Sequence, residues 1–347
     1  MGAALSFPQL LEQLLEGRDL DSPQAERLMR GWIGEQIDPA LTGALLAALR
    51  CKGLRGEELA AMAQVLREHC PLPGPRPALH LVDTCGTGGA GVDSFNISTA
   101  VAFTAAACGA HVAKHGNRSA SGRVGSADVL EALGLDLQAP AARVIAALPE
   151  AGVTFLFAPG WHPALVGLVP LRRALGVRTV FNLLGPLVNP LRPDCQVLGV
   201  ARADLLDPMV EALRQLGQGR AIVVHGHGGL DEATLSGPSE LRLLDQGEVR
   251  QEWLDPLALG LQQAPMAAIG GGDLEQNRRL LEAVLQGEGD QARSDVVALN
   301  TALVLWTCGL AASVAEALPE ARECLRSGRP WQRLEALRAA LATPAAG

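Results

Sequence analysis

Polar and glycine-rich residues are concentrated in three short stretches of this 347-residue chain. The first, GTGGAG at 86–91, is followed by Ser94, Asn96, Ser98 and Thr99 just before an apolar run. Glycines let the backbone approach a ligand closely, and the free N–H groups of a helix start attract an anion. The stretch matches neither the dinucleotide-binding G-x-G-x-x-G pattern nor the P-loop, so it predicts phosphate binding without implying NAD or ATP. A tight strand–helix turn is the structural alternative.

The second stretch, KHGNRSASG at 114–122, gathers cationic and hydrogen-bonding side chains. Lys114, His115 and Arg118 supply cationic or polar donors, and Asn117 adds an amide. Ammonium and guanidinium groups bind oxyanions such as a diphosphate. We therefore expect this loop to hold an oxyanion-rich ligand, although a solvated basic turn is the alternative.

The third stretch, GHGGLDE at 226–232, ends in the adjacent carboxylates of Asp231 and Glu232. Such a pair can hold Mg²⁺ through one or two oxygens while the phosphates of a substrate supply further ligands. Taken alone, an Asp-Glu pair is typical of a solvated turn. Together with an anion-binding helix start and a cationic loop, it predicts a metal–diphosphate site.

Each of the three stretches follows a predicted strand. The sequence alternates short apolar strands with helical segments, which is typical of a mainly parallel sheet covered on both faces. Ligands of such sheets bind beyond the carboxyl ends of the strands, so we expect the three loops to meet there. The predicted strands are 80–85, 111–116, 154–159, 195–201 and 221–226.

The residues before these strands predict helices only. In the second predicted helix, Ser22 is expected to be the N-cap and Pro23 the first helical residue. PLPGPRP at 71–77 marks a boundary. The expected fold class is therefore α/β, with a small N-terminal helical domain over 1–77 and a larger α/β domain over 78–347. In the second domain, a hairpin turning at Gln246-Gly247 is also expected.

The composition narrows the function classes. A formal net charge of −8 argues against a nucleic-acid partner or an anionic membrane surface, because both usually need a basic field. The N-terminus lacks the pattern of a signal peptide, and the most apolar stretch is far too short to span a membrane. Seven cysteines without a CxxC pair favour reduced thiols in the cytoplasm over disulfides or a zinc site.

Five segments, in order and at fitting spacings, resemble one known family. They are CGTGGAG with FNIST, KHGNRSASG, GSADVLEALG, HPA with LRRALGVRTVFNLLGPLVNP, and VVHG with GLDE. The chain is similar to the anthranilate phosphoribosyltransferases of tryptophan biosynthesis over essentially its whole length. The resemblance implies a homodimer and transfer of a phosphoribosyl group from phosphoribosyl diphosphate to anthranilate with Mg²⁺. It also implies a cleft between the two domains, with a segment at about 163–190 returning to the helical domain.

Matching positions imply a set of site residues. Lys114, His115 and Arg172 are the expected catalytic residues, and His115 and Gly185 line the anthranilate region. The resemblance implies contacts with anthranilate at Gly86, Asn117 and Arg172, and magnesium ligation by Ser98, Asp231 and Glu232. It implies contacts with phosphoribosyl diphosphate at Gly86, Gly89, Ala90, Ser94, Asn96, Ile97, Ser98, Thr99, Lys114, His115, Gly116, Asn117, Arg118, Ser119, Ala120, Ser121, Gly122 and Ser126.

One residue departs from the family pattern. Family members usually read GTGGDG, whereas this chain has Ala90 at the acidic position. We hypothesise that the activity survives while a contact near the phosphoribosyl and metal end of the substrate is lost or rerouted. Two rival functions are a pyrimidine nucleoside phosphorylase on the same fold and a non-catalytic relative that binds nucleic acid. The LGVRTVFNLLGPLVNP segment disfavours the first, and the acidic charge disfavours the second.

Overall fold

The N-terminal fifth of the chain forms four helices. The computed structural model describes residues 5–70, 72–89, 91, 93–119 and 124–342. Asp21 is the N-cap of the second helix, because its carboxylate accepts the N–H of Gln24 at 2.8 Å, so the prediction of Ser22 as the N-cap is wrong by one residue. The four helices are α1 (Phe7–Leu15), α2 (Ser22–Ile33), α3 (Pro39–Lys52) and α4 (Gly56–Glu68).

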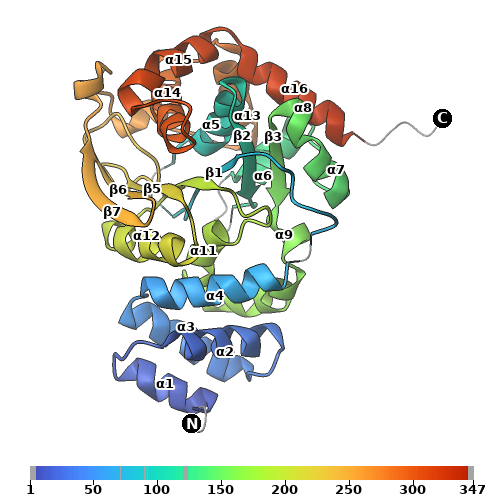
Figure 1. The fold of residues 1–347 in the computed structure, drawn as a ribbon, viewed down its shortest axis with the longest axis vertical. Coiled ribbons are helices and arrows are strands. Elements are labelled where there is room, and N and C mark those ends of the chain that lie inside the picture. The colour runs from blue at the N-terminus through green and yellow to red at the C-terminus, as the bar shows by residue number, and fades with distance from the viewer. Residues whose placement is uncertain (1–4, 71, 90, 92, 120–123, 343–347) are drawn as a thin grey trace, which may run out of the picture.

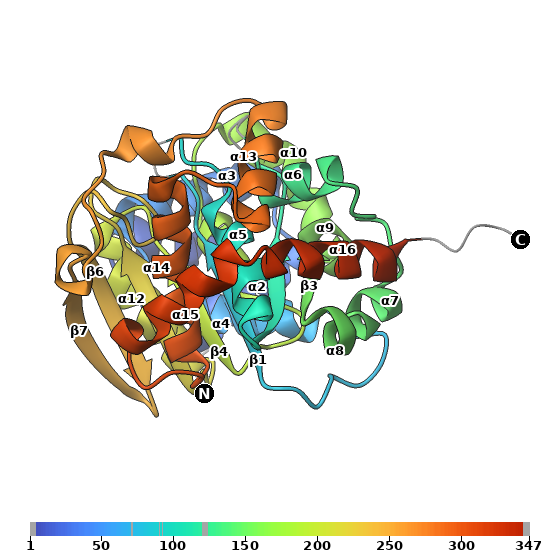
Figure 2. The same ribbon diagram turned by 90° about the horizontal axis from the view of Figure 1, so that it is seen from above.

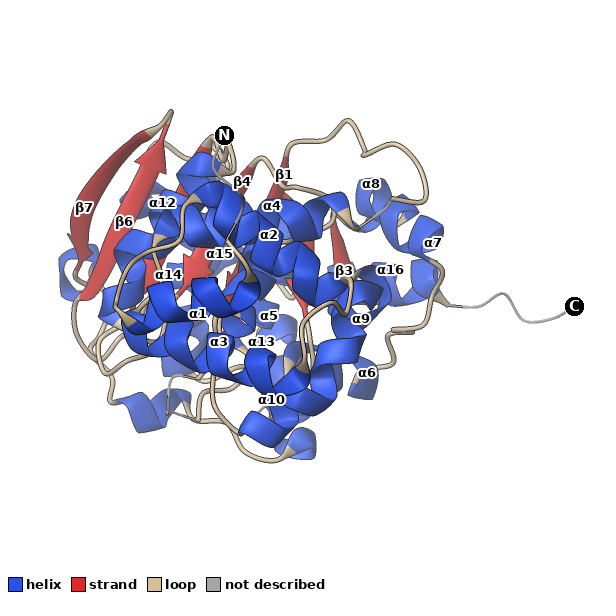
Figure 3. Cartoon of the chain, turned by 90° about the horizontal axis from the view of Figure 1, so that it is seen from below, coloured by secondary structure: helices blue, strands red, loops and turns tan. Residues whose placement is uncertain are grey.

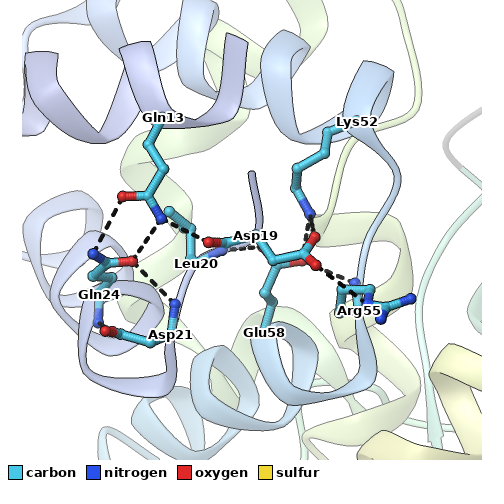
Figure 4. Close-up of polar contacts among 8 residues, drawn as sticks. All are labelled: Gln13, Asp19, Leu20, Asp21, Gln24, Lys52, Arg55 and Glu58. Carbon is cyan, nitrogen blue, oxygen red and sulfur yellow. Dashed lines mark hydrogen bonds and ion pairs between the residues drawn. The ribbon is translucent and has the colours of Figure 1, made fainter. Parts of the chain in front are cut away.

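A buried ion pair fastens the turns between these helices (Figure 4). The Lys52 Nζ donates to Glu58 Oε2 at 2.9 Å, and both side chains are almost completely buried. Glu58 also accepts the backbone N–H of Leu20 at 2.9 Å and that of Arg55 at 2.8 Å. One carboxylate thus holds the α1–α2 connection against the start of α4.

A single seven-stranded sheet forms the centre of the rest of the chain. The strand order is β3-β2-β1-β4-β5-β6-β7, with the first five strands parallel and the last two antiparallel. The predicted class, a helical domain with a larger α/β domain and a mainly parallel sheet, is confirmed. The strands are β1 (Leu81–Gly86), β2 (His111–Gly116), β3 (Val153–Phe157), β4 (Cys195–Gly199), β5 (Arg220–His225), β6 (Ser239–Asp245) and β7 (Glu248–Leu254).

The predicted hairpin is also confirmed, and it forms one edge of the sheet (Figure 3). Gln246 and Gly247 connect β6 to β7 with φ angles of 48° and 87°. Two successive residues with positive φ are the signature of the tight turn that suits the twist of a hairpin.

Helices cover both faces of the sheet (Figures 1 and 2). One face packs against α5 and the C-terminal helices, and the opposite face packs against α12, which in turn contacts α4. The remaining helices are α5 (Ile97–Ala107), α6 (Ser126–Ala132), α7 (Ala141–Ala146), α8 (Leu148–Ala151), α9 (Ala158–Trp161), α10 (Val169–Leu175), α11 (Phe181–Leu184), α12 (Leu206–Gln215), α13 (Leu274–Gln286), α14 (Gln291–Thr307), α15 (Val314–Arg326) and α16 (Arg329–Leu341).

Alternation along the strands divides the apolar core into two clusters. Val197 and Ile222 belong to the cluster beneath α5 and α14, whereas their neighbours Leu198 and Val223 belong to the cluster shared with α1–α4. Residues 180–188 also contribute to this second cluster. Within the described ranges, no helix is long and apolar enough to cross a membrane.

Candidate active site

The loops that follow β1, β2 and β5 line one cavity of about 380 Å³. The strand order reverses between β1 and β4, and ligands of open α/β sheets bind at such a switch point. Ala90, Ala120, Ser121 and Gly122 lie outside the described residues. Every other residue predicted for the site lines the cavity, namely Gly86, Gly89, Ser94, Asn96, Ile97, Ser98, Thr99, Lys114, His115, Gly116, Asn117, Arg118, Ser119, Ser126, Arg172, Asp231 and Glu232.

Lys114 lies buried at the floor of the cavity. Its Nζ donates to the carbonyl of Thr84 at 2.7 Å and to the hydroxyl of Ser98 at 3.1 Å. Burial lowers the pKa of Lys114, and the nearby carboxylates, Asp83 foremost, oppose that shift. The ammonium is therefore fixed between β1 and the first turn of α5, so it can face an anion without rearranging.

Sequence reasoning missed the buried carboxylate beneath Lys114. Asp83 on β1 accepts the N–H of His115 at 3.2 Å and the side-chain amide of Asn189 at 2.8 Å. Burial raises the pKa of Asp83 to about 6, although Lys114 opposes the shift. The only signal in the sequence was an acid inside the apolar strand HLVDTC.

Asp231 fits into a notch formed by two glycines of adjacent strands. Gly86 of β1 is paired in register with Gly199 of β4. A Cβ on Gly86 would lie 2.2 Å from Asp231 Oδ2, and one on Gly199 would lie 1.5 Å from the Asp231 carbonyl oxygen. The same Oδ2 accepts the N–H of Gly88 at 2.7 Å. The absence of side chains at both positions therefore lets the Asp231 carboxylate lie against the glycine loop that follows β1.

The acidic pair is suited to a hard cation. Glu232 is half-buried, and its buried Oε2 has no hydrogen-bond partner among the described residues. Burial raises the pKa of both Asp231 and Glu232, and in Glu232 the neighbouring Asp231 adds to the shift. No cluster of three or more His, Cys, Asp or Glu side chains suited to a metal occurs in the described ranges. A cation here would therefore complete its shell with hydroxyl, water or substrate oxygens.

The helix start beside these acids presents further polar atoms. Asn96 is the N-cap of α5, and its side-chain amide donates to the carbonyl of Val124 at 3.1 Å. Asn96 Oδ1 and Thr99 Oγ1 are buried without a hydrogen-bond partner in the described part of the chain. Buried polar atoms in that state are candidates for ligand contacts.

A second wall of the cavity combines neutral histidine with arginine. His115 Nδ1 lies 3.1 Å from the carbonyl of Gly185, and the ring centroids of His115 and His162 are 5.2 Å apart. Burial lowers the pKa of His115 to about 3 and that of His162 to about 4, so both imidazoles are neutral near pH 7. The Arg172 guanidinium lies 5.3 Å from the ring centroid of Phe181.

Arg118 lines the cavity, but its charge is already neutralised. The guanidinium binds Asp128 at 2.9 Å and Glu131 at 2.8 Å, both on α6. These acids raise the pKa of Arg118 further. Its side chain therefore fastens the loop to α6.

Other lining residues were not among the predicted site residues. They come from the loops after β1 and β2 and from the segment between β3 and β4, whose motif LGVRTVFNLLGP was the available signal. They include Thr87, Gly88, Val124, Gly125, Ala158, Arg178, Phe181, Asn182 and Pro186.

Comparisons with known proteins agree along the whole chain. Residues 8–70 match the helical bundle domain of a glycosyl transferase family, and residues 78–330 match the a/b domain of that family. The chain is 66% identical over 342 residues to anthranilate phosphoribosyltransferase of Synechococcus sp. (strain RCC307), covering 99% of each. It is 64% identical over 339 residues to that of Prochlorococcus marinus (strain MIT 9313), covering 98% of this chain and 97% of the relative.

Solved structures give the same result. The crystal structure of anthranilate phosphoribosyltransferase from Thermus thermophilus superposes with a TM-score of 0.88 at 43% identity, over 95% of this chain and 98% of that one. The enzyme from Saccharomyces cerevisiae in complex with PRPP and Mg superposes with a TM-score of 0.87 at 25% identity, over 96% of this chain and 97% of that one.

Proposed function

The chain belongs to the anthranilate phosphoribosyltransferase family, and from this premise we propose how its cavity performs the reaction of that family. The enzyme transfers the phosphoribosyl group of 5-phosphoribosyl diphosphate to the amine of anthranilate. The products are N-(5-phosphoribosyl)anthranilate and diphosphate, in tryptophan biosynthesis. The observation that carries the assignment of residues is the convergence of a glycine loop, a cationic loop, an acidic pair and Arg172 on one cavity.

The sheet side of the cavity takes the donor substrate. The ribose carbon loses diphosphate through a cation-like transition state, so the main task is to stabilise the charge of the leaving group. Lys114 and the start of α5 provide fixed positive potential for that charge. Ser98, Asp231 and Glu232 would hold Mg²⁺, since the unpartnered Glu232 Oε2 suits a hard cation. When bound, that ion neutralises charge on the diphosphate.

The wall formed by the segment between β3 and β4 takes the acceptor substrate. Arg172 can bind the anthranilate carboxylate through two parallel hydrogen bonds. The aryl amine is already unprotonated at neutral pH, so the reaction needs positioning more than a strong base. A neutral His115 can accept a hydrogen bond from that amine without adding positive charge near the developing cation.

The assembly and location of the enzyme are part of the same proposal. We infer a homodimer, because Leu15, Val166 and Val177 expose apolar side chains on the helical domain and on the segment at 163–190 that we assign to it. We place the boundary of the helical domain near residue 77. The seven cysteines, all of them free thiols, favour the cytoplasm.

Loss of anthranilate fluorescence in the presence of phosphoribosyl diphosphate and Mg²⁺ tests the function. We expect turnover by the wild-type chain and none of thymidine with phosphate. Arg172→Ala should raise the KM for anthranilate about 10- to 100-fold, as expected for loss of a charge-assisted hydrogen bond. Arg173→Ala removes an exposed neighbouring charge and is the matched control. Wild-type kinetics in Arg172→Ala would exclude Arg172 from the acceptor site.

A further inference from the structure

Arg178 reaches the cavity from the connection between α10 and α11 and lies against the glycine loop that follows β1. Its Nη2 donates to the carbonyl of Thr87. A Cβ on Gly89 would lie 2.2 Å from Nη1 and 2.6 Å from Cζ of Arg178, and Gly89 has a φ of +82°. The positive φ favours glycine at position 89, and any larger residue there would have to push the guanidinium away from the loop.

The backbone around Arg178 is bound to the N-terminal helical domain. Arg50 of α3 donates from Nη1 to the Arg178 carbonyl at 2.7 Å. The next residue, Thr179, donates its N–H to Asn182 Oδ1 at 2.8 Å, and residues 180–188 share the apolar cluster of α1–α4. Arg178 therefore extends from the helical side of the cavity to the phosphate loop on the sheet side.

The cationic side chains that line the described part of the cavity differ in the groups that they already contact. Lys114 is bonded to a carbonyl and a hydroxyl above buried carboxylates, and Arg118 is paired with two acids of α6. Within the described ranges neither Arg172 nor Arg178 has a carboxylate within ion-pair distance, and the Asp231 carboxylate offsets only part of the burial that lowers the pKa of Arg178. Arg172 lies over Phe181 on the acceptor wall, whereas Arg178 lies on the phosphate loop, where Gly88 also meets Asp231. The two guanidiniums therefore serve different ends of the cavity.

Building on the proposed function, we propose that Arg178 is a further binding residue for the diphosphate of the phosphoribosyl donor. A guanidinium has five N–H donors in a planar fork, which matches two phosphate oxygens better than an ammonium does. Its bond to the Thr87 carbonyl fixes the group beside the loop before substrate arrives. A cation held in place in this way stabilises the charge that develops on the departing diphosphate.

Inorganic diphosphate with Mg²⁺ is the direct probe, measured by titration calorimetry on the full chain. Arg178→Gln should weaken diphosphate binding and raise the KM for phosphoribosyl diphosphate, each about 10- to 100-fold, while the KM for anthranilate stays within about twofold. Arg178→Lys keeps the positive charge but loses the planar fork of donors, so its diphosphate affinity and its KM for phosphoribosyl diphosphate should lie between those of the wild type and Arg178→Gln. Arg173→Gln, an equal charge loss outside the cavity, should match the wild type.

Chemical rescue separates binding from a merely structural role. Guanidinium ions at millimolar concentration should restore part of the diphosphate affinity of Arg178→Ala and leave Arg173→Ala unchanged. Diphosphate binding by Arg178→Gln and Arg178→Lys within about twofold of wild type would overturn the proposal, as would an effect confined to the KM for anthranilate. If the wild-type chain binds diphosphate but does not consume anthranilate, the proposed function fails while the test of Arg178 still stands.

Discussion

Because Gly86 and Gly199 form the notch for Asp231, adding a single methyl group at position 199 should disturb the site. An alanine Cβ at position 199 would lie 1.5 Å from the Asp231 carbonyl oxygen and 2.4 Å from its carbonyl carbon. Real Cβ atoms essentially never approach another heavy atom closer than 3.0 Å, so the loop must retreat by about 1.5 Å. The atoms concerned are backbone atoms, and no side-chain rotation relieves the overlap.

We therefore expect Gly199→Ala to displace Asp231 and Glu232 together. A misplacement of about 1 Å at a reacting group can cost about 100-fold in rate, so kcat/KM should fall at least that far. Overpacking should also lower the free energy of unfolding by about 1–3 kcal/mol, which leaves a chain that can be purified and assayed.

The assay is the initial rate of anthranilate consumption across a Mg²⁺ titration. Gly199→Ala should need more Mg²⁺ for half-maximal rate than the wild type. In Gly86→Ala the two atoms nearest to the added methyl group belong to the Asp231 side chain, which can rotate away. This variant should therefore show a smaller loss of kcat/KM and a smaller rise in the Mg²⁺ requirement than Gly199→Ala. Gly160→Ala, with no atom within 4 Å of the added methyl group, is the matched control. Wild-type kcat/KM and Mg²⁺ dependence in Gly199→Ala would refute the role of the glycine notch.

Three further perturbations test other parts of the structure. Glu58→Gln removes one of the two carboxylates that pair with the buried Lys52 and leaves Asp19 at 2.7 Å, so it should lower the free energy of unfolding in urea by about 2 kcal/mol, whereas Glu16→Gln, in an exposed pair, should change it by less than about 1 kcal/mol. A loss below about 1 kcal/mol for Glu58→Gln would contradict the buried pair. Burial lowers the folded-state pKa of His162 from 6.5 to about 4, so its contribution to stability is present above pH 6.5 and is lost as the pH falls toward 4. Between pH 7 and pH 5 the wild type should lose about 2 kcal/mol that His162→Gln does not lose, and equal losses in the two chains would count against a buried neutral His162. Ala90→Asp restores the Asp that the family usually has in GTGGDG and should lower the apparent KM for phosphoribosyl diphosphate at saturating Mg²⁺. An unchanged KM would refute the hypothesis that Ala90 costs a contact with the substrate.

Local patterns predicted those parts of the fold and site that depend on neighbouring residues. The strand at 111–116 and the turn at Gln246-Gly247 lie where alternation and turn chemistry predict them. Most of the predicted site residues lie in loops directly after strands, where consecutive residues carry the chemistry, whereas Arg172 on α10 and Ser126 at the start of α6 were implied only by the family resemblance. The N-cap was missed by one residue, because Asp21 and Ser22 are both good caps and only the fold selects between them.

Contacts between residues far apart in the chain could not be predicted from the sequence. Asp83 and Asn189 are 106 positions apart, and their hydrogen bond depends on the placement of β4 beside β1. The contact of Arg178 with the glycine loop after β1 could not be predicted, because 91 positions separate Arg178 from Thr87. Arg118 was predicted from its loop alone, and its neutralisation by α6 appears only when the chain is folded. A single sequence records side-chain chemistry, whereas strand order decides which side chains meet.

The cavity wall that contains Arg172, Phe181 and Gly185 has a consequence for protein engineering. These residues come from one continuous stretch between β3 and β4, whereas the residues that we propose for the donor come mainly from the ends of β1, β2 and β5. In the proposed function, acceptor binding by Arg172 is thus encoded in a different length of chain from the donor site, whereas the acceptor contacts proposed for Gly86, His115 and Asn117 come from the donor loops. A library confined to 158–186 would sample new amine acceptors while keeping the donor machinery, except for Arg178, which is the one position in that stretch to hold constant.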